Sequence, residues 1–209
     1  MPARPLPSLR CPAMLRGALP LRLLPLLAML IATSGQAAGG YDQGTPAGKG
    51  DLDLDFTLNP MDRVKNGQSY VVWGYGLTDR LDFHGYASHE AGGTDQIYYG
   101  LMVNFYRNAW LDLSTAFGLR HRSGRTHRLF PQLLYTVRLP QQFDLIGSFT
   151  RVTDTKDGPV GRTTIDLALR IPLPEAWRPS LAKEWKLDLG AFRNTGGQWN
   201  PTYSVDFKF

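Results

Sequence analysis

The stretch that decides the fold is Leu52-Asp53-Leu54-Asp55-Phe56-Thr57-Leu58, in which apolar and polar residues alternate without a break. Successive side chains of a β-strand point to opposite faces, so a period of two predicts a strand with one apolar and one polar face. The same alternation recurs along the chain as far as Phe209, whereas no helical period of 3.6 residues persists. The pattern therefore predicts an all-β protein.

Ten segments carry this alternation: residues 51–59, 70–77, 81–90, 97–106, 109–120, 129–139, 143–152, 163–171, 185–194 and 202–209. Their even number and their length suit tilted strands that cross a bilayer, for which about 9–11 residues are needed. No stretch is apolar for the roughly 20 residues of a membrane helix. We predict a single antiparallel transmembrane up-and-down β-barrel of ten strands. Eight strands are the alternative if the first segment and one neighbour are not strands.

The connections between these segments favour a membrane barrel over a soluble sandwich, which would also alternate. Short connections at 78–80, 107–108 and 140–142 take turns with longer ones that are rich in Gly and polar residues. Outer-membrane barrels have short periplasmic turns and longer extracellular loops. The long, Pro-rich connection 172–183 is the exception to this rule.

The N-terminal part of the chain has the layout of a secretory signal peptide. Residues 1–22 contain four Arg and no acid, residues 23–32 are apolar, and Gly35 and Ala37 precede a predicted cleavage after residue 37. The start codon of this leader is Met1 or Met14. The apolar run is too short to cross a bilayer as a helix. We therefore predict export to the outer membrane of a Gram-negative cell.

Cleavage changes what the composition means. The whole chain has 23 basic and 18 acidic residues and a formal charge of +5. The leader holds four of the basic residues, none of the acidic ones and the single Cys, so the mature chain has a charge of +1. This removes the main support for a nucleic-acid partner, and it excludes disulfide and cysteine–zinc sites. We expect residues 38–50, rich in Gly and Ala, to be a flexible segment and residues 51–209 to form the barrel.

An apolar–Asp–apolar motif begins every odd-numbered segment and predicts a ring of charges inside the barrel. Its acids are Asp53, Asp82, Asp112, Asp144 and Asp188, and the returning segments end with Arg138, Arg170 and Lys208 on the same parity. The three-residue turn at 140–142 places Arg138 opposite Asp144. Inward placement keeps these charges off the lipid face, where a basic residue at the midplane costs about 2–4 kcal/mol.

Large aromatic residues share this inward parity, namely Tyr70, Tyr86, Tyr98, Tyr106, Trp110, Phe130 and Phe192. Eight strands leave room for side chains alone, and ten strands are close to that limit. We expect a lumen plugged by aromatic side chains and salt bridges, with an open pore as the alternative.

The last segment resembles the C-terminal signature of Gram-negative outer-membrane proteins. Tyr203, Val205, Phe207 and Phe209 alternate in register and end at the chain terminus. In that family the barrel-assembly machinery reads the terminal aromatic residue and the alternating residues before it. The resemblance implies this machinery as a partner during biogenesis.

A second, shorter resemblance lies in Gly76-Leu77-Thr78-Asp79-Arg80-Leu81-Asp82-Phe83. This stretch is similar to a hairpin of the outer-membrane proteins of phenol meta-degradation pathways and of related transporter-like barrels. Those proteins are thought to pass hydrophobic compounds, so the resemblance implies passage of such a solute.

Candidate catalytic residues are few. His84 and Ser88 share the inward face of one strand but lie about 13 Å apart along it, too far for a direct nucleophile–base contact. His89 has the opposite parity. These three residues form the enzyme hypothesis, in which the barrel modifies lipid A or phospholipid at the outer leaflet, with rim hydrogen bonding as the simpler explanation of each histidine. We predict no cofactor and no metal site.

A cluster of arginines, Arg120, Arg122, Arg125 and Arg128, surrounds a connection at the predicted extracellular rim, where guanidinium groups would bind lipopolysaccharide phosphates. Outer-membrane lipid and lipopolysaccharide are thus the expected partners. The leading hypothesis for function is passive passage or binding of a small, hydrophobic or other, solute without catalysis. The alternatives are the lipid-modifying enzyme and a purely structural barrel.

Overall fold

The structure is a computed structural model that describes residues 42–59, 68–90, 95–122, 125–128, 132–152, 162–193, 197 and 199–209. It contains the strands β1 (Leu52–Asn59), β2 (Gln68–Gly76), β3 (Leu81–Glu90), β4 (Asp95–Arg107), β5 (Leu111–Arg122), β6 (Arg125–Arg128), β7 (Gln132–Arg138), β8 (Asp144–Val152), β9 (Arg162–Pro172), β10 (Glu184–Arg193) and β11 (Trp199–Lys208). Two 3₁₀ turns, η3 (Pro140–Gln142) and η4 (Glu175–Trp177), complete the described elements. Within these residues no helix is long and apolar enough to cross a membrane.

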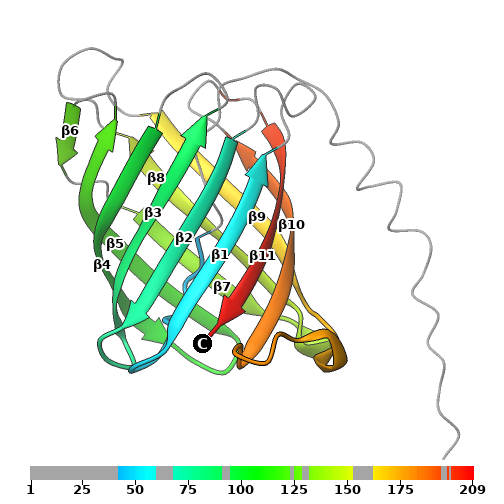
Figure 1. Cartoon of the computed structure of the whole chain (residues 1–209). Coiled ribbons are helices and arrows are strands. Elements are labelled where there is room, and N and C mark those ends of the chain that lie inside the picture. The colour runs from blue at the N-terminus through cyan, green and yellow to red at the C-terminus, as the bar shows by residue number, and fades with distance from the viewer. Residues whose placement is uncertain are drawn as a thin grey trace, which may run out of the picture.

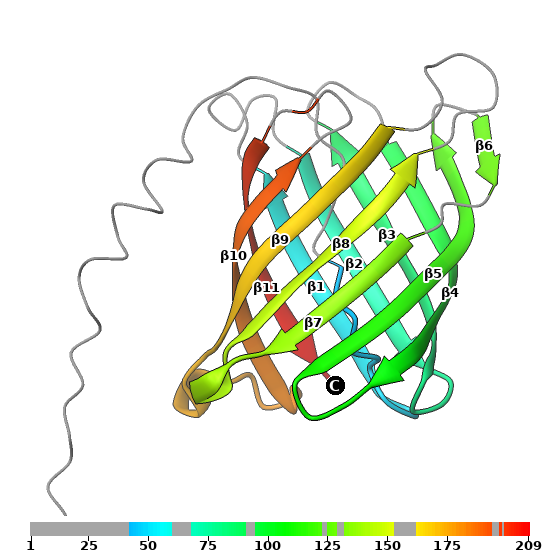
Figure 2. The same ribbon diagram turned by 180° about the vertical axis from the view of Figure 1, so that it is seen from behind.

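Ten of the strands close into one antiparallel barrel, which confirms the predicted fold class and strand number. Consecutive strands pair from β1 to β5 and from β7 to β11, β5 pairs with β7, and β1 pairs with β11, so the ring has no free edge (Figures 1 and 2). The ends of the ten strands lie within three residues of the predicted segments. The additional strand β6 pairs with β5 alone.

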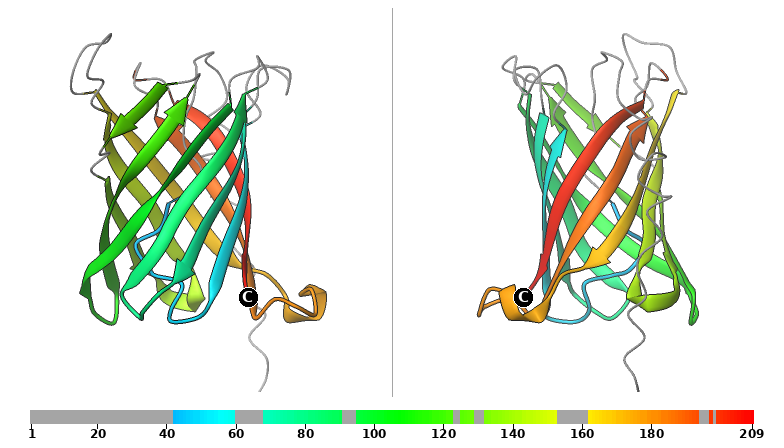
Figure 3. Two further views of the ribbon diagram at one scale, coloured as in Figure 1. Left: turned by 60° about the vertical axis from the view of Figure 1, so that its left-hand side comes forward. Right: turned by 90° about the vertical axis from the view of Figure 1, so that its right-hand side faces the viewer.

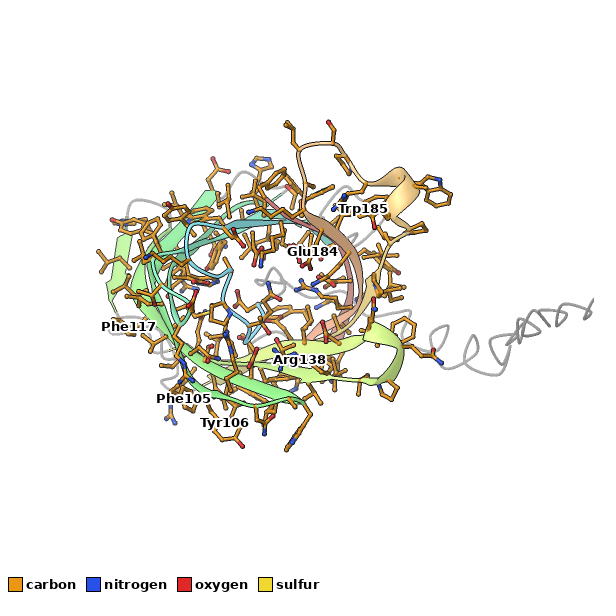
Figure 4. The ribbon with its side chains drawn as sticks, turned by 90° about the horizontal axis from the view of Figure 1, so that it is seen from below. Phe105, Tyr106, Phe117, Arg138, Glu184 and Trp185 are labelled. Atoms are coloured by element: carbon orange, nitrogen blue, oxygen red, sulfur yellow. The ribbon has the colours of Figure 1, made fainter. Side chains whose placement is uncertain are left out.

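The two faces of the barrel wall follow the alternation in the sequence. In β3, Asp82, His84 and Ser88 are buried, whereas Phe83, Ala87 and His89 on the other parity are exposed. Across the barrel, the large apolar side chains that are most exposed point away from the lumen, as Figure 4 shows for Phe105 and Phe117. The outer surface is therefore apolar, whereas the lumen holds the buried polar and charged side chains together with smaller apolar clusters such as that of Met102, Ala116 and Leu134.

A β-bulge in β4 changes the parity of the residues after it. The register to β5 shifts between Asn104 and Tyr106, so Asn104 is buried in the lumen and Tyr106 is on the outside (Figure 4). An extra residue in one strand reverses the alternation beyond it. The prediction that Tyr106 fills the lumen is therefore wrong. The same prediction for Trp110 is wrong for another reason, since Trp110 lies in the connection between β4 and β5 and is 57% exposed. Phe130 lies outside the described residues.

The two ends of the barrel differ. We call the end with the connections 77–80, 108–110, 139–143 and 173–183 the turn end, and the opposite end, where Asn59, Gln68, Glu90 and Asp95 lie, the loop end. The connection 173–183 projects sideways at the turn end (Figure 3). It is folded around η4, with Arg178 paired to Glu175 at 2.9 Å and the Trp185 Nε1 donating to Pro174 O at 3.1 Å.

The seam between β1 and β11 is closed at the turn end by the last residue of the chain. Phe209 N donates to Leu52 O at 2.8 Å, and Leu52 N donates to Phe209 O at 3.2 Å. The seam continues through six register pairs from Asp53–Lys208 to Leu58–Tyr203. The first and last strands thus start and finish at the same end of the barrel.

Candidate functional site

The lumen is lined by polar side chains with a large excess of acids. Among the described residues with buried side chains, seven are Asp and one is Arg. The acids are Asp42, Asp55, Asp82, Asp112, Asp166, Asp188 and Asp206. Asp55, Asp166 and Asp206 share the inward parity of the predicted ring, so the alternation alone could have added them.

Arg170 of β9 is the centre of the charge network, with its side chain 2% exposed. It forms a bidentate pair with Asp188, Nε to Oδ1 at 2.8 Å and Nη2 to Oδ2 at 2.7 Å. Its Nη1 is 3.2 Å from Asp206 Oδ2, and it also donates to the side-chain oxygen of Gln43. A buried cation with this many oxygen partners joins β9, β10, β11 and the N-terminal segment.

Arg138 takes a different partner from the one that its register position predicts. Its Cα lies opposite that of Asp144, as the turn length indicates. Its guanidinium instead contacts Asp112 of β5, with Nη2 2.5 Å from Oδ2, because the side chain reaches across to the other neighbouring strand. Arg107 contacts the same carboxylate at 3.3 Å. Figure 4 shows Arg138 on the inner side of the wall at the turn end.

The remaining ring residues lie at the mouth of the turn end. Asp53 and Lys208 are register partners, and both line a cavity of about 210 Å³ together with Asp144 and Glu184. The Lys208 ammonium itself contacts Asp51 at 3.2 Å, just outside β1. Seven of the eight predicted ring residues thus fall into three separate groups of contacts, and the eighth, Asp82, accepts a hydrogen bond from Ala47 N instead.

Residues 42–50 enter the lumen and cross it between the strands (blue in Figure 1; also Figure 4). Gly44 N donates to Thr136 Oγ1 at 3.0 Å, and Gly44 O accepts from Ser114 Oγ at 2.5 Å. Thr45 Oγ1 donates to Asp112 at 2.8 Å, and Ala47 N donates to Asp82 at 2.8 Å. We call residues 42–50 the lumenal segment.

The glycines of the lumenal segment serve close contact, whereas composition predicts a flexible segment here. A Cβ on Gly44 would lie 2.7 Å from Asp112 O and 2.8 Å from Tyr135 Cα, so the segment touches the backbone of the wall. Gly48 and Gly50 have φ of +92° and +82°, a conformation that other residues rarely adopt. The glycine content thus fits a backbone in close contact with two strands at Gly44, followed by a tight turn at Gly48 and Gly50. Residues 38–41 lie outside the described residues.

The lumenal segment borders two cavities. One, of about 30 Å³, is lined among others by Asp42, His84 and Arg170. The other is the cavity of about 210 Å³ at the turn end, which Gln43 and Thr45 also line. The segment thus occupies part of the lumen, and these two spaces remain beside it.

The three residues of the enzyme hypothesis do not come together. His84 is buried in the lumen, with Nε2 3.2 Å from Asp42 Oδ1 of the lumenal segment and its ring 5.9 Å from that of Tyr98. Ser88 is buried further along the same face of β3. His89 points to the outside, where its Nδ1 lies 2.6 Å from Asp95 Oδ1.

An apolar groove of about 760 Å³ lies at the loop end, along β1 to β5. Its apolar walls are made by outward residues such as Phe56, Leu58, Val71 and Ile97. Polar residues that follow the apolar series on each strand, including His89 and Asp95, also line it. His121 lines the groove as well and stacks on Tyr99, with 5.6 Å between ring centroids.

The arginine cluster is described in part. Arg120 lies opposite Tyr98, whose buried side chain faces the lumen, so its register directs it inward and away from the apolar outer surface. The backbones of Arg122, Arg125 and Arg128 belong to β5 and β6, and their side chains lie outside the described residues. A lipopolysaccharide role for the four arginines stays a prediction.

The C-terminal residues of the predicted assembly signature lie on the outer face at the seam. Tyr203 is exposed, and Phe207 contacts three aromatic rings, those of Phe56, Trp185 and Phe209, at centroid distances of 6.1–6.4 Å. Val205 has the same outward parity. Recognition of this surface by the assembly machinery stays a prediction. Among the described residues, no group of three or more His, Cys, Asp or Glu is arranged to hold a metal ion.

Comparison with solved structures finds barrels of low similarity. The chain is 9% identical to KdgM porin, over 76% of this chain and 98% of the porin, with a TM-score of 0.44. Two de novo designed transmembrane β-barrels match at 8% and 7% identity, covering 77% and 78% of this chain and 97% and 94% of theirs, each with a TM-score of 0.39. No protein-family description matches the chain, and no curated protein matches it.

Proposed function

We propose that the chain is an outer-membrane barrel for gated passage of a small polar solute, and that the lumenal segment is its gate. One observation carries the proposal: a segment of the chain's own backbone occupies the lumen by contacts with the wall. A ring that encloses such a segment is wide enough for a small solute once the segment leaves. In this proposal the turn end faces the periplasm and the loop end the cell exterior.

The apolar outer surface supports the placement in a membrane. Exposed Phe, Leu and Ile side chains stand on the outside of several strands, and polar residues take their place near the loop end. In water, contiguous apolar surface of this extent would drive association, whereas in lipid it is solvated. The signal peptide predicted for residues 1–37 and the terminal Phe209 agree with the same route.

The lining of the lumen supports a polar and preferably cationic solute. The acids exceed the bases among the buried side chains, so wherever these carboxyl groups are ionised the lumen favours cations over anions. A hydrophobic solute, as the resemblance to the phenol-pathway barrels implies, would meet buried acids on this route beside apolar side chains such as Met102, Leu134 and Ile146.

The contacts of the lumenal segment are suited to a gate because they are a small number of hydrogen bonds and ion pairs to side chains of the wall. Each typical hydrogen bond contributes about 0.5–1.5 kcal/mol, and more when one partner is charged. They join the segment to β3, β5, β7 and β9, so the segment can leave without breaking a strand pair.

The test is conductance through planar bilayers, comparing the exported chain with a variant that lacks residues 42–47. We expect rare, small openings for the unaltered protein and steady cation-selective conductance for the variant. The variant keeps Gly48 and Gly50, so the turn into β1 is retained. Heat-modifiable migration in gels establishes that both proteins form the barrel.

Two results would overturn the proposal. A folded deletion variant that conducts no more than the unaltered protein would show that the segment does not obstruct a pathway. Anion selectivity in a salt gradient would contradict the role of the acidic lining.

A further inference from the structure

We infer that Ser69, His89 and Asp95 form a Ser–His–Asp hydrolytic site on the outer surface of the barrel, and that its substrate is the acyl ester of a membrane lipid. The inference goes beyond the proposed function, with which it shares the placement in the membrane. It uses neither the lumen nor the gate.

The register of three neighbouring strands sets these residues side by side. Ser69 of β2 is the direct partner of His89 in β3, and His89 is the direct partner of Asp95 in β4. All three are exposed on the outer face, since their neighbours Tyr70, Ser88 and Gln96 are buried on the lumenal face. The order across the sheet is therefore nucleophile, base and carboxylate.

The contacts fit the roles of such a set. Asp95 Oδ1 lies 2.6 Å from Nδ1 of His89, which leaves Nε2 as the nitrogen available to a nucleophile. Directly opposite residues of an antiparallel pair have Cβ atoms about 4.5–5.5 Å apart. The hydroxyl of Ser69 and the imidazole are thus within reach by side-chain rotation, and catalytic hydrogen bonds commonly tighten when substrate binds.

The surroundings identify the class of substrate. The three residues line the groove of about 760 Å³, where outward apolar side chains such as Phe56, Leu58 and Ile97 lie beside them. A groove of this size and polarity suits an acyl chain. On β2, β3 and β4 the three polar residues come immediately above outward apolar residues, which is the depth at which lipid ester bonds meet water.

The chemistry is an ordinary acyl transfer to water. Ser69 Oγ bonds to the ester carbonyl carbon while His89 takes the hydroxyl proton. The bond from that carbon to the alkoxy oxygen then breaks, and His89 returns the proton to the departing alcohol. Water, deprotonated by His89, next attacks the acyl-serine, so that a fatty acid leaves and Ser69 regains its proton. One ester and one water give one acid and one alcohol.

Glycerophospholipids and lipid A both offer this ester, and the test separates them. The purified full chain is placed in vesicles of phosphatidylethanolamine or in vesicles containing lipid A, and released fatty acids are measured by mass spectrometry. We expect release from at least one of the two. The variants Ser69→Ala and His89→Ala reduce release to that of protein-free vesicles, whereas Asp95→Asn retains a small fraction.

The matched control is Thr163→Ala, which removes an exposed hydroxyl from the loop end of β9, away from the groove. We expect its release to equal that of the unaltered protein. A fluorophosphonate probe offers a second readout that does not depend on a variant folding, because it should label the unaltered protein at Ser69.

Absence of release from both lipids, or labelling at another serine, would overturn the inference. So would a folded Ser69→Ala variant with full activity. These outcomes leave the conductance result of the gate untouched, so the two proposals can fail separately.

Discussion

Two histidines of β3, five residues apart, each contact an aspartate, and the two pairs have opposite surroundings. His84 contacts Asp42 at 3.2 Å in the lumen, where the two side chains are 6% and 8% exposed. His89 contacts Asp95 at 2.6 Å on the outer surface, where they are 66% and 79% exposed. The inner pair connects the lumenal segment to the wall, and the outer pair faces an apolar groove. An odd spacing along one strand thus assigns the same two residue types to two different roles.

The largest effect expected from this comparison is on lipid hydrolysis. His89→Ala should lower fatty-acid release by about 10⁴-fold or to the uncatalysed background, because the base of the site is lost. His84→Ala, the matched change on the inner face, should leave release unchanged and increase conductance. Paired measurements of release and conductance on both variants check this. If the two variants had equal effects on fatty-acid release or on conductance, the assignment of hydrolysis to the outer face and of gating to the lumenal face would be contradicted.

The next effect concerns buried against exposed ion pairs. Arg170→Met should lower the free energy of unfolding by about 3–5 kcal/mol, because Asp188 and Asp206 would remain buried without their cation. Arg178→Met breaks the exposed pair with Glu175 and should cost about 0–1 kcal/mol. Urea unfolding of the barrel in detergent micelles measures both. A similar cost for the two would mean that burial does not determine the strength of these pairs.

A smaller effect is expected where the lumenal segment touches the wall. Gly44→Ala adds a Cβ within 3 Å of three backbone atoms of β5 and β7. Overpacking of this kind costs about 1–3 kcal/mol, and here the segment can escape it by leaving the lumen. We therefore expect increased conductance with little change in unfolding of the barrel.

Gly74→Ala is the control, since its added Cβ would come no nearer than 3.5 Å to any atom outside the adjacent residues. Its conductance should remain that of the unaltered protein. If Gly44→Ala behaved in the same way, the close contact of the segment with the wall would not be holding it.

The smallest effect is expected on the pH dependence of stability, at Asp51, which directly follows the lumenal segment. Lys183, followed by Lys208, holds the pKa of Asp51 below its ordinary value of 3.8 by hydrogen bonding. A lowered pKa in the folded state stabilises the protein above the ordinary pKa, and this contribution is lost as the pH falls through the folded value. Between pH 5 and 2 (about one to two units either side of the ordinary pKa), Asp51→Asn should therefore lose less stability than the unaltered protein. Urea unfolding across this range measures the difference, and parallel curves would contradict it.

The sequence predicted the wall of the barrel well because alternation acts locally. The strand number, the faces and the opposition of Arg138 and Asp144 all follow from a period of two and from turn length. The error at Tyr106 has the same origin, since a bulge of one residue leaves no mark in the composition but reverses every later position of the strand.

The sites were harder to predict because they depend on distances between strands. The glycine-rich composition around Gly44 predicts mobility. Glycine is also needed where the chain approaches another backbone too closely for a Cβ, and this is the case at Gly44. Ser69, His89 and Asp95 lie on three different strands. Their positions side by side depend on the register of β2 with β3 and of β3 with β4, and the sequence alone fixes neither register. One signal in the sequence could have indicated this site: on each of the three strands, the outward-facing apolar residues are followed, toward the loop end, by an outward-facing polar residue.

The order of contacts along the lumenal segment has a mechanical consequence. From Asp42 to Gly50 the segment is attached in turn to β3, to the Arg170 network, to β5 and β7, and finally to Gly76, to which Gly50 donates at 2.8 Å. Ala47 lies between the last two of these and binds Asp82 of β3. Because the attachments are spread along the segment, the Asp42 end can detach while the Gly50 end stays bound to Gly76 and keeps the segment beside the lumen.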